Sequence, residues 1–200
     1  MNNHSLIIPK PMQVITLIAR ALAFCSGMAV IALAFIIAID IGARSLLRVS
    51  IQGSDEIGGY VLAMIGSLGL AYTLLQKGHP RVDLGFRFMP KSLHAPLHVI
   101  ALIGMTGMAI FMTVHVWTEL GKTLAFGTVT NTPLQTPLWV PQGLWLFGIV
   151  FFALTAGIAS IHAIYLLFKS PKKVLQLYGT NSVEEEVTHY VDLPSLKGDS

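Results

Sequence analysis

The sequence predicts an all-α membrane protein with four transmembrane helices, both termini in the cytoplasm, and an interfacial helix after the first span. Only 12% of the residues are charged, whereas soluble globular domains carry about 25%. All 23 charged residues (13 basic and 10 acidic) lie outside four apolar stretches, which are Ala21–Ile39, Ile57–Gln76, Ser92–Thr118 and Gly143–Phe168. A bilayer core about 30 Å thick needs about 20 residues at 1.5 Å per residue. Each stretch is therefore long enough to cross a membrane.

The first stretch is expected to stay in the protein as a helix rather than to be removed as a signal peptide. Arg20 precedes it and Ala32-Leu33-Ala34 has the small residues of a cleavage site, but the apolar run continues to Ile39. The apolar region of a secretory signal is only about 7–15 residues long. The single cysteine, Cys25, lies in this stretch and can form neither an intrachain disulfide nor a cysteine metal site.

Charged residues at intervals of four follow the first span. Asp40, Arg44 and Arg48 would align on one face if the helix continued, and Asp40 and Arg44 could then pair. The apolar residues between them could be buried in the outer interface while the arginines reach the lipid headgroups. We expect this segment to lie along the membrane as an interfacial helix.

The second span has a distinctive start, face and end. Asp55 and Glu56 precede it, where carboxylates favour the positive end of the helix dipole. Gly78 is expected at the C′ position that ends the helix. Small residues recur every four positions at Gly59, Ala63, Ser67 and Ala71. Such a stripe allows close approach of another helix, either within this chain or from another subunit.

The loop before the fourth span, residues 119–142, contains three prolines that disfavour regular structure. Pro141 suits the first turn of the fourth helix. Three tryptophans flank the loop at the expected headgroup depth, and they are Trp117, Trp139 and Trp145.

Loop charges predict the orientation. For a four-pass chain, ten Lys and Arg residues fall on the side of the termini and three fall on the other side, which places both termini in the cytoplasm. Residues 1–170 are expected to form the transmembrane domain, and 171–200 a flexible or docked cytoplasmic tail. The basic residues are spread over the loops, so no nucleic-acid partner is expected.

The spans hold few groups that could carry chemistry. Asp40, Glu56 and Glu119 are all placed at outer helix ends, so no span has the central carboxylate of a proton-coupled antiporter, and a stand-alone small multidrug-type transporter is disfavoured. The spacing of His98 and His162 leaves open an alternative, a four-helix membrane cytochrome or electron carrier with two axial histidines. No hydrolase, HExxH or phosphate-loop motif is present in the sequence, so we expect neither an enzyme nor a bound cofactor or metal.

The order of several motifs resembles the small membrane subunit of tripartite ATP-independent periplasmic (TRAP) transporters, the DctQ-like family. Family members have an acidic pair opening helix two, a Tyr four residues later, a Gly nine residues after that, a Gly-His at the following loop and a Pro-rich, Trp-containing entry to helix four. The similar residues here are Asp55, Glu56, Tyr60, Gly69, Gly78, His79, Asp83 and the segment from Thr136 through Trp139 to Pro141. One departure is Gly53, where the family commonly has a Trp.

This resemblance implies a non-catalytic small permease subunit in a bacterial inner membrane. Its partner would be a large multi-helix permease subunit that moves the solute with a sodium gradient, while a periplasmic binding protein delivers an organic-acid-type solute. The small subunit would enlarge the scaffold of the large one. Candidate contact or structural residues are Asp55, Glu56, Gly59, Tyr60, Ala63, Ser67, Ala71, Gly78, His79, Asp83, Trp139 and Pro141.

Overall fold

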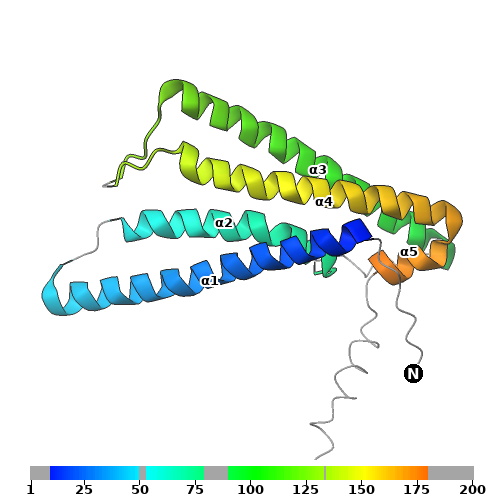
Figure 1. Ribbon diagram of the computed structural model, residues 1–200, viewed down its shortest axis with the longest axis horizontal. Helices are drawn as coiled ribbons and strands as arrows, with labels where there is room; N and C mark the ends of the chain where they lie inside the picture. The colour runs from blue at the N-terminus through cyan, green and yellow to red at the C-terminus, as the bar shows by residue number, and fades with distance from the viewer. Residues whose placement is uncertain (1–9, 50–52, 79–89, 133, 180–200) are drawn as a thin grey trace, which may run out of the picture.

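A computed structural model describes residues 10–49, 53–78, 90–132 and 134–179. Five helices follow one another along these segments (Figure 1). They are α1 (Lys10–Leu47), α2 (Ser54–Leu75), α3 (Lys91–Phe126), α4 (Trp139–Lys169) and α5 (Pro171–Tyr178). The first four are long and apolar enough to cross a membrane. The prediction of an all-α protein with four membrane-spanning helices is confirmed.

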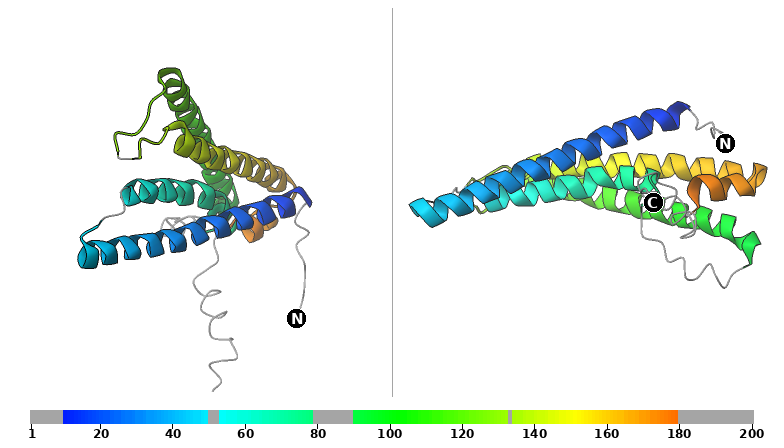
Figure 2. Two further views of the ribbon diagram at one scale, coloured as in Figure 1. Left: turned by 60° about the vertical axis from the view of Figure 1, so that its left-hand side comes forward. Right: turned by 90° about the horizontal axis from the view of Figure 1, so that it is seen from below.

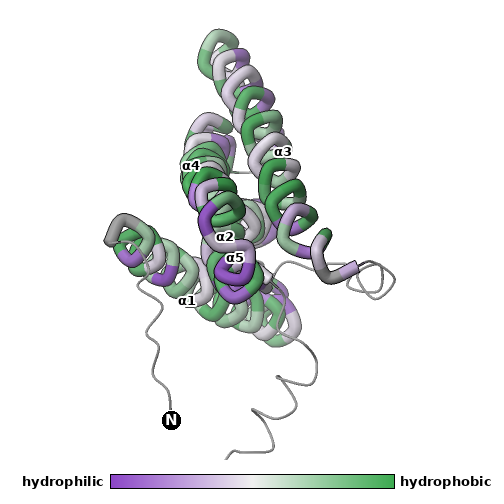
Figure 3. Tube along the Cα trace, turned by 90° about the vertical axis from the view of Figure 1, so that its right-hand side faces the viewer, coloured by the Kyte–Doolittle hydropathy of each residue, from purple (hydrophilic) through white to green (hydrophobic). Residues whose placement is uncertain are grey.

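The four long helices form an open row rather than a closed bundle. The extensively packed pairs are α1 with α2, α2 with α4, and α4 with α3. Figures 1 and 3 show the same order, with α1 and α3 at the two edges and α2 and α4 between them. Because each edge helix packs extensively on one long neighbour among the described residues, much apolar surface stays exposed there.

Helix α1 packs on α2 through a seven-residue repeat. Its buried positions are Ala19, Ser26, Leu33 and Asp40, at intervals of seven. A repeat of this length keeps one seam facing the partner helix when two helices cross at a shallow, left-handed angle. Gly58 of α2 lies opposite this seam, since a Cβ added to it would lie 4.0 Å from Leu33 Cδ1.

Small residues let α4 approach both of its neighbours. A Cβ added at Gly148 would lie 2.5 Å from Ser67 Oγ of α2, so only glycine fits at this crossing. On the other side of α4, the hydroxyls of Thr106 and Ser160 lie 2.8 Å apart and link α3 to α4. Close backbones and interhelical hydrogen bonds are the interactions that associate helices in lipid. The crossing with α4 therefore explains why the small-residue stripe of α2 is buried at Ser67.

The end of α1 differs from the prediction. Residues 40–47 continue α1 without a break, so the expected separate interfacial helix is not present in the described part of the chain. Arg44 donates to Asp40 at 2.8 Å, which confirms the predicted pair. Arg48 does not extend the aligned face, because α1 ends before it and its φ is 56°, in the left-handed region.

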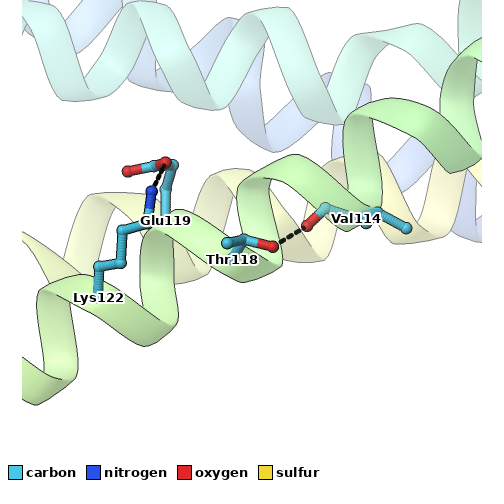
Figure 4. A network of polar contacts seen from close by, with 4 residues as sticks. All are labelled: Val114, Thr118, Glu119 and Lys122. Carbon is cyan, nitrogen blue, oxygen red and sulfur yellow. Dashed lines mark hydrogen bonds and ion pairs between the residues drawn. The ribbon is translucent and has the colours of Figure 1, made fainter.

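The third span is longer than predicted. Helix α3 continues through residue 119 to Phe126 and ends at Gly127, a left-handed C-cap with φ 58°. The additional two turns carry an exposed ion pair between Lys122 Nζ and a Glu119 carboxylate oxygen at 2.7 Å (Figure 4). The loop to α4 is correspondingly short, and Pro141 lies in the first turn of α4 as expected.

Helix α5 packs against α3 and α4 at the end of the molecule that holds the start of α1. Val174 and Tyr178 are its buried residues, whereas Lys172 and Lys173 are exposed. Figure 3 shows that α5 is the most hydrophilic of the five helices. The first nine residues of the expected tail are thus docked on the helix row.

Candidate functional site

The first turn of α2 carries a buried carboxylate that joins this helix to the loop between α3 and α4. Glu56 is 9% exposed and Ser54 beside it is also buried. Gly53 forms the N-cap with φ 89° and makes no side-chain cap; its carbonyl accepts the Ile57 amide at 3.0 Å. The left-handed conformation of Gly53, which glycine adopts without steric cost, lets the chain enter the helix sharply at this point.

Three hydroxyl groups donate to this carboxylate. Thr130 Oγ1 donates to Oε1 at 2.8 Å, Thr132 Oγ1 donates to Oε2, and the Tyr60 hydroxyl, one helical turn along α2, donates to Oε1. The two threonine hydroxyls also lie 2.8 Å from each other, and Thr130 Oγ1 lies 3.4 Å from the Thr136 carbonyl, so the carboxylate is the charged acceptor in a small network of hydroxyl groups. Hydrogen bonds to an ionised acceptor are about twice as strong as neutral ones, so this carboxylate fastens the loop to α2.

The loop itself is a short hairpin. The Thr130 amide donates to the Thr136 carbonyl at 3.0 Å, and the Leu138 amide donates to the Thr128 carbonyl at 3.1 Å. An isolated antiparallel bridge pairs Val129 with Pro137. Figure 1 shows the loop leaving the end of α3 and descending toward the start of α2 before it returns to α4.

The unusual glycine at position 53 has a structural explanation. A Cβ at Gly53 would lie 1.7 Å from Leu134 Cδ1. Leu134 of the hairpin therefore occupies the space beside Gly53, and no Trp side chain fits there. The loop residue replaces the aromatic side chain that the resemblance leads one to expect at this position.

Asp55 and Glu56 have different surroundings. Asp55 is exposed and Glu56 is buried. The other candidate residues of α2 divide in the same manner: Gly59 is exposed, whereas Ser67 and Ala71 are buried within the chain. Because a spacing of four drifts around a helix with 3.6 residues per turn, the stripe begins on an open face and ends against α4.

The C-terminal end of α2 corrects the prediction that Gly78 is its C′ residue. The left-handed C′ residue is Lys77, with φ 58°, and not Gly78. The Lys77 amide donates to the Leu74 carbonyl at 3.1 Å, and the Gly78 amide donates to the Thr73 carbonyl at 2.8 Å. This is the Schellman pattern with Lys77 at C′ and Gly78 at C″. Lys77 Nζ also donates to the Gln176 carbonyl of α5 at 2.9 Å.

Two predicted residues, His79 and Asp83, lie outside the described residues, and Trp139 is half exposed at the first position of α4.

The two histidines of the cytochrome alternative lie in different environments. His162 Nδ1 lies 2.8 Å from the Tyr178 hydroxyl of α5, and the two rings meet edge to face. Burial raises the pKa of Tyr178 well above its ordinary value, so this phenol keeps its proton and can donate it to the imidazole. His98 is buried on α3. His162 thus fastens α5 to α4, and the arrangement does not support an axial haem ligand.

A family profile covers most of the chain, including this site. Residues 33–166 match the family described as tripartite ATP-independent periplasmic transporters, DctQ component. The chain belongs to the DctQ family. The matched region includes the acidic pair, the α3–α4 hairpin and the α2–α4 crossing, so this DctQ protein is a transporter component with several membrane-spanning helices. A search of curated proteins gave no match, and a search of solved structures gave none.

Thr130 and Thr132 were not among the predicted site residues. A signal was nevertheless present, since threonines alternate at positions 128, 130 and 132 in a stretch without charges. In an extended chain such a spacing of two places the three hydroxyls on one side. A buried acceptor for that side would have been a reasonable expectation.

Proposed function

We propose that this DctQ component is the non-catalytic small permease subunit of a sodium-coupled, binding-protein-dependent secondary transporter for organic-acid-type solutes. Its task is to pack beside the large permease subunit and to extend the rigid scaffold on which that subunit moves its solute. The observation that carries the proposal is the open helix row, which leaves apolar helix faces without a partner in a chain of the DctQ family.

The distribution of charge supports a scaffold rather than a transport site. The described carboxylates all lie at one end of the row, and they are Asp40, Asp55, Glu56 and Glu119. Each is within two turns of a helix end. Coupling ions are usually bound near the middle of the membrane by polar groups of interrupted helices, and such groups belong to the proposed partner.

The exposed surface supports a membrane partner. Leu17, Phe24 and Phe35 of α1 are each 66–68% exposed. On α2, the exposed Gly59, Leu62 and Gly66 lie on one face, and an added Cβ at either glycine would meet nothing within 4 Å. Lipid covers such faces readily, and a helix of the large subunit would pack closely against the glycines.

The loop charges support an orientation with both termini in the cytoplasm of a bacterial inner membrane. The Glu56 end of the row then faces the periplasm, where a solute-binding protein would approach. The hairpin fastened by Glu56 lies on that face and is held by backbone hydrogen bonds of its own. We therefore assign Glu56 a positioning role for the periplasmic surface.

Reconstituted uptake tests the proposal. Proteoliposomes would contain this chain alone, the large subunit alone, or both, with the binding protein and the solute that it retains. We expect sodium-dependent uptake only when both membrane proteins are present. Uptake by this chain alone would contradict a scaffold role, and uptake by both proteins without a sodium gradient would contradict the coupling.

A variant at Glu56 tests the contribution of the site to the complex. Glu56→Ala removes the acceptor of three hydroxyl groups and releases the hairpin. We expect a lower yield of the large subunit in co-purification, whereas Asp55→Ala serves as the neighbouring control. Unchanged complex yield and unchanged transport in Glu56→Ala would count against any role of Glu56 between subunits.

A further inference from the structure

A cavity of about 200 Å³ lies where α1, α2, α4 and α5 meet, at the end of the molecule opposite Glu56. The right-hand view of Figure 2 shows that the N-terminal end of α1 diverges from α2 and α4 in this region. Half of the lining residues are aliphatic, and they are Met12, Leu74, Leu75, Ala159 and Leu177. The volume is several times the roughly 30 Å³ that one water molecule occupies in the liquid. Apolar walls of this kind favour a hydrocarbon occupant over ordered water.

Polar side chains line the same cavity on the side of the helix ends. Lys77 brings a positive charge, and its position is fixed by the hydrogen bond from Nζ to the Gln176 carbonyl. His162 and Tyr178 also line the cavity and are bonded to each other. The site therefore combines an apolar interior with a cation whose place is set by the fold.

The depth of the cavity matches the boundary between hydrocarbon and headgroups. Helix α2 has 22 residues, a length of about 33 Å, which is close to the hydrocarbon thickness of a bilayer. Lys77 lies two residues beyond its end. A lipid in the same leaflet would place its acyl chain beside the apolar wall and its phosphate at the level of Lys77.

The charge of this end of the molecule selects the class of lipid. The described basic side chains here are Arg20, Lys77, Lys169, Lys172 and Lys173, whereas the described carboxylates are at the opposite end. A positive protein surface at the membrane boundary attracts anionic headgroups.

We propose that this basal cavity, formed by α1, α2, α4 and α5, binds part of an acyl chain of an anionic phospholipid whose phosphate lies beside Lys77. The bound lipid would fill the space that α1 leaves as it diverges, and would thereby hold the start of α1 against α4 and α5. This inference does not depend on the solute, the sodium coupling or the large subunit.

Native mass spectrometry of the full-length protein in a mild detergent tests the proposal. The probes are dioleoylphosphatidylglycerol, dioleoylphosphatidylcholine and glycerol 3-phosphate. We expect a retained adduct with the first lipid, a much weaker one with the second, and no competition from the third, because it has no acyl chain. Equal retention of both lipids would overturn the anionic preference, and competition by glycerol 3-phosphate would overturn the role of the apolar cavity.

Two variants locate the site. Thr16→Phe places a ring in the cavity and removes only a hydroxyl bonded to the Met12 carbonyl of its own helix. Its control is Thr118→Phe on α3, where the hydroxyl makes the same kind of bond to the Val114 carbonyl (Figure 4) and lies outside the cavity. We expect Thr16→Phe to reduce phosphatidylglycerol retention to the level of phosphatidylcholine, and Thr118→Phe to leave it unchanged.

The charge is tested in the same assay. Lys77→Gln is expected to weaken phosphatidylglycerol binding about fivefold, because it removes the cation that lines the cavity beside the proposed phosphate position. Lys172→Gln removes an equal charge from the exposed side of α5, outside the cavity, and should weaken binding clearly less than Lys77→Gln. Equal losses in the two lysine variants, or full retention in Thr16→Phe, would overturn the assignment; the lysine pair decides the question if Thr16→Phe does not fold.

Discussion

Replacing Glu56 with Gln should release the α3–α4 hairpin while leaving α2 intact. Thr130 and Thr132 donate to the carboxylate from the hairpin. Hydrogen bonds to a charged group contribute about 1.5–3 kcal/mol and neutral ones about 0.5–1.5 kcal/mol. Gln keeps one acceptor oxygen and has an amide nitrogen in place of the other, so one of the two threonine hydroxyls must accept rather than donate. Both bonds then belong to the neutral class, which lowers the local stability of the hairpin by about 2–3 kcal/mol. We expect amide hydrogen exchange in residues 128–138 to accelerate about 30- to 150-fold.

Asp55→Asn is the matched control for this experiment. It makes the same chemical change at the neighbouring residue, whose side chain is exposed. Its expected effect is confined to the first turn of α2, where a carboxylate near the helix N-terminus contributes about 0.3–1 kcal/mol. If the hairpin exchanges at the same rate in wild type and Glu56→Gln, the carboxylate does not hold the loop and the reasoning about this site is wrong.

Three further predictions concern close contacts elsewhere in the fold. Gly53→Ala should lower stability by about 1–3 kcal/mol, because it forces a non-glycine residue to φ 89° and its Cβ against Leu134; a melting temperature equal to wild type would contradict this geometry, and Leu134→Ala should restore only the steric part. Gly148→Ala should cost about 1–3 kcal/mol by overpacking, since the new Cβ would also lie 2.9 Å from the backbone carbonyl carbon of Ser67; an unchanged melting temperature would show that α2 and α4 are farther apart than described. Tyr178→Phe should weaken the docking of α5 by about 1 kcal/mol, seen as about fivefold faster exchange in α5, and equal exchange would remove the hydroxyl–imidazole bond from the explanation of that docking.

The sequence contains enough information to predict the number and class of the helices. The charge-free stretches directly reflect the cost of placing ionised groups in hydrocarbon, so each span could be located. The ends of the helices were less predictable, since α3 continues past Glu119 and Lys122 to Phe126. A charged pair on an exposed helix surface at the membrane boundary costs little, and the loss of apolar character therefore does not mark the end of the helix.

The open order of the row was not predictable from the same pattern. Nothing in apolar periodicity distinguishes a helix covered by protein from one covered by lipid, because both faces are apolar. The close approach of α2 and α4 needs the absence of a side chain at Gly148 opposite Ser67, a fit that apolar periodicity does not reveal. Similarly, the C-terminus of α2 could not be predicted, because Lys77 adopts the left-handed conformation that glycine adopts more readily.

The candidate site could be predicted in part. The acidic pair was identifiable from its position before α2, but its two members could not be distinguished by sequence. Burial separates them, because Glu56 is satisfied by hydroxyls of a loop more than 70 residues away. Long-range partners of this kind leave only a weak local signal, here the alternating threonines.

Affinity isolation of this chain from its native membranes tests the central claim most directly. We predict that a mild detergent will release it together with one large protein of ten or more membrane-spanning helices, in about equal amounts, and that the binding protein will join when its solute is added. Isolation of this chain alone, or with partners that lack a multi-helix membrane protein, would contradict its role as a scaffold subunit.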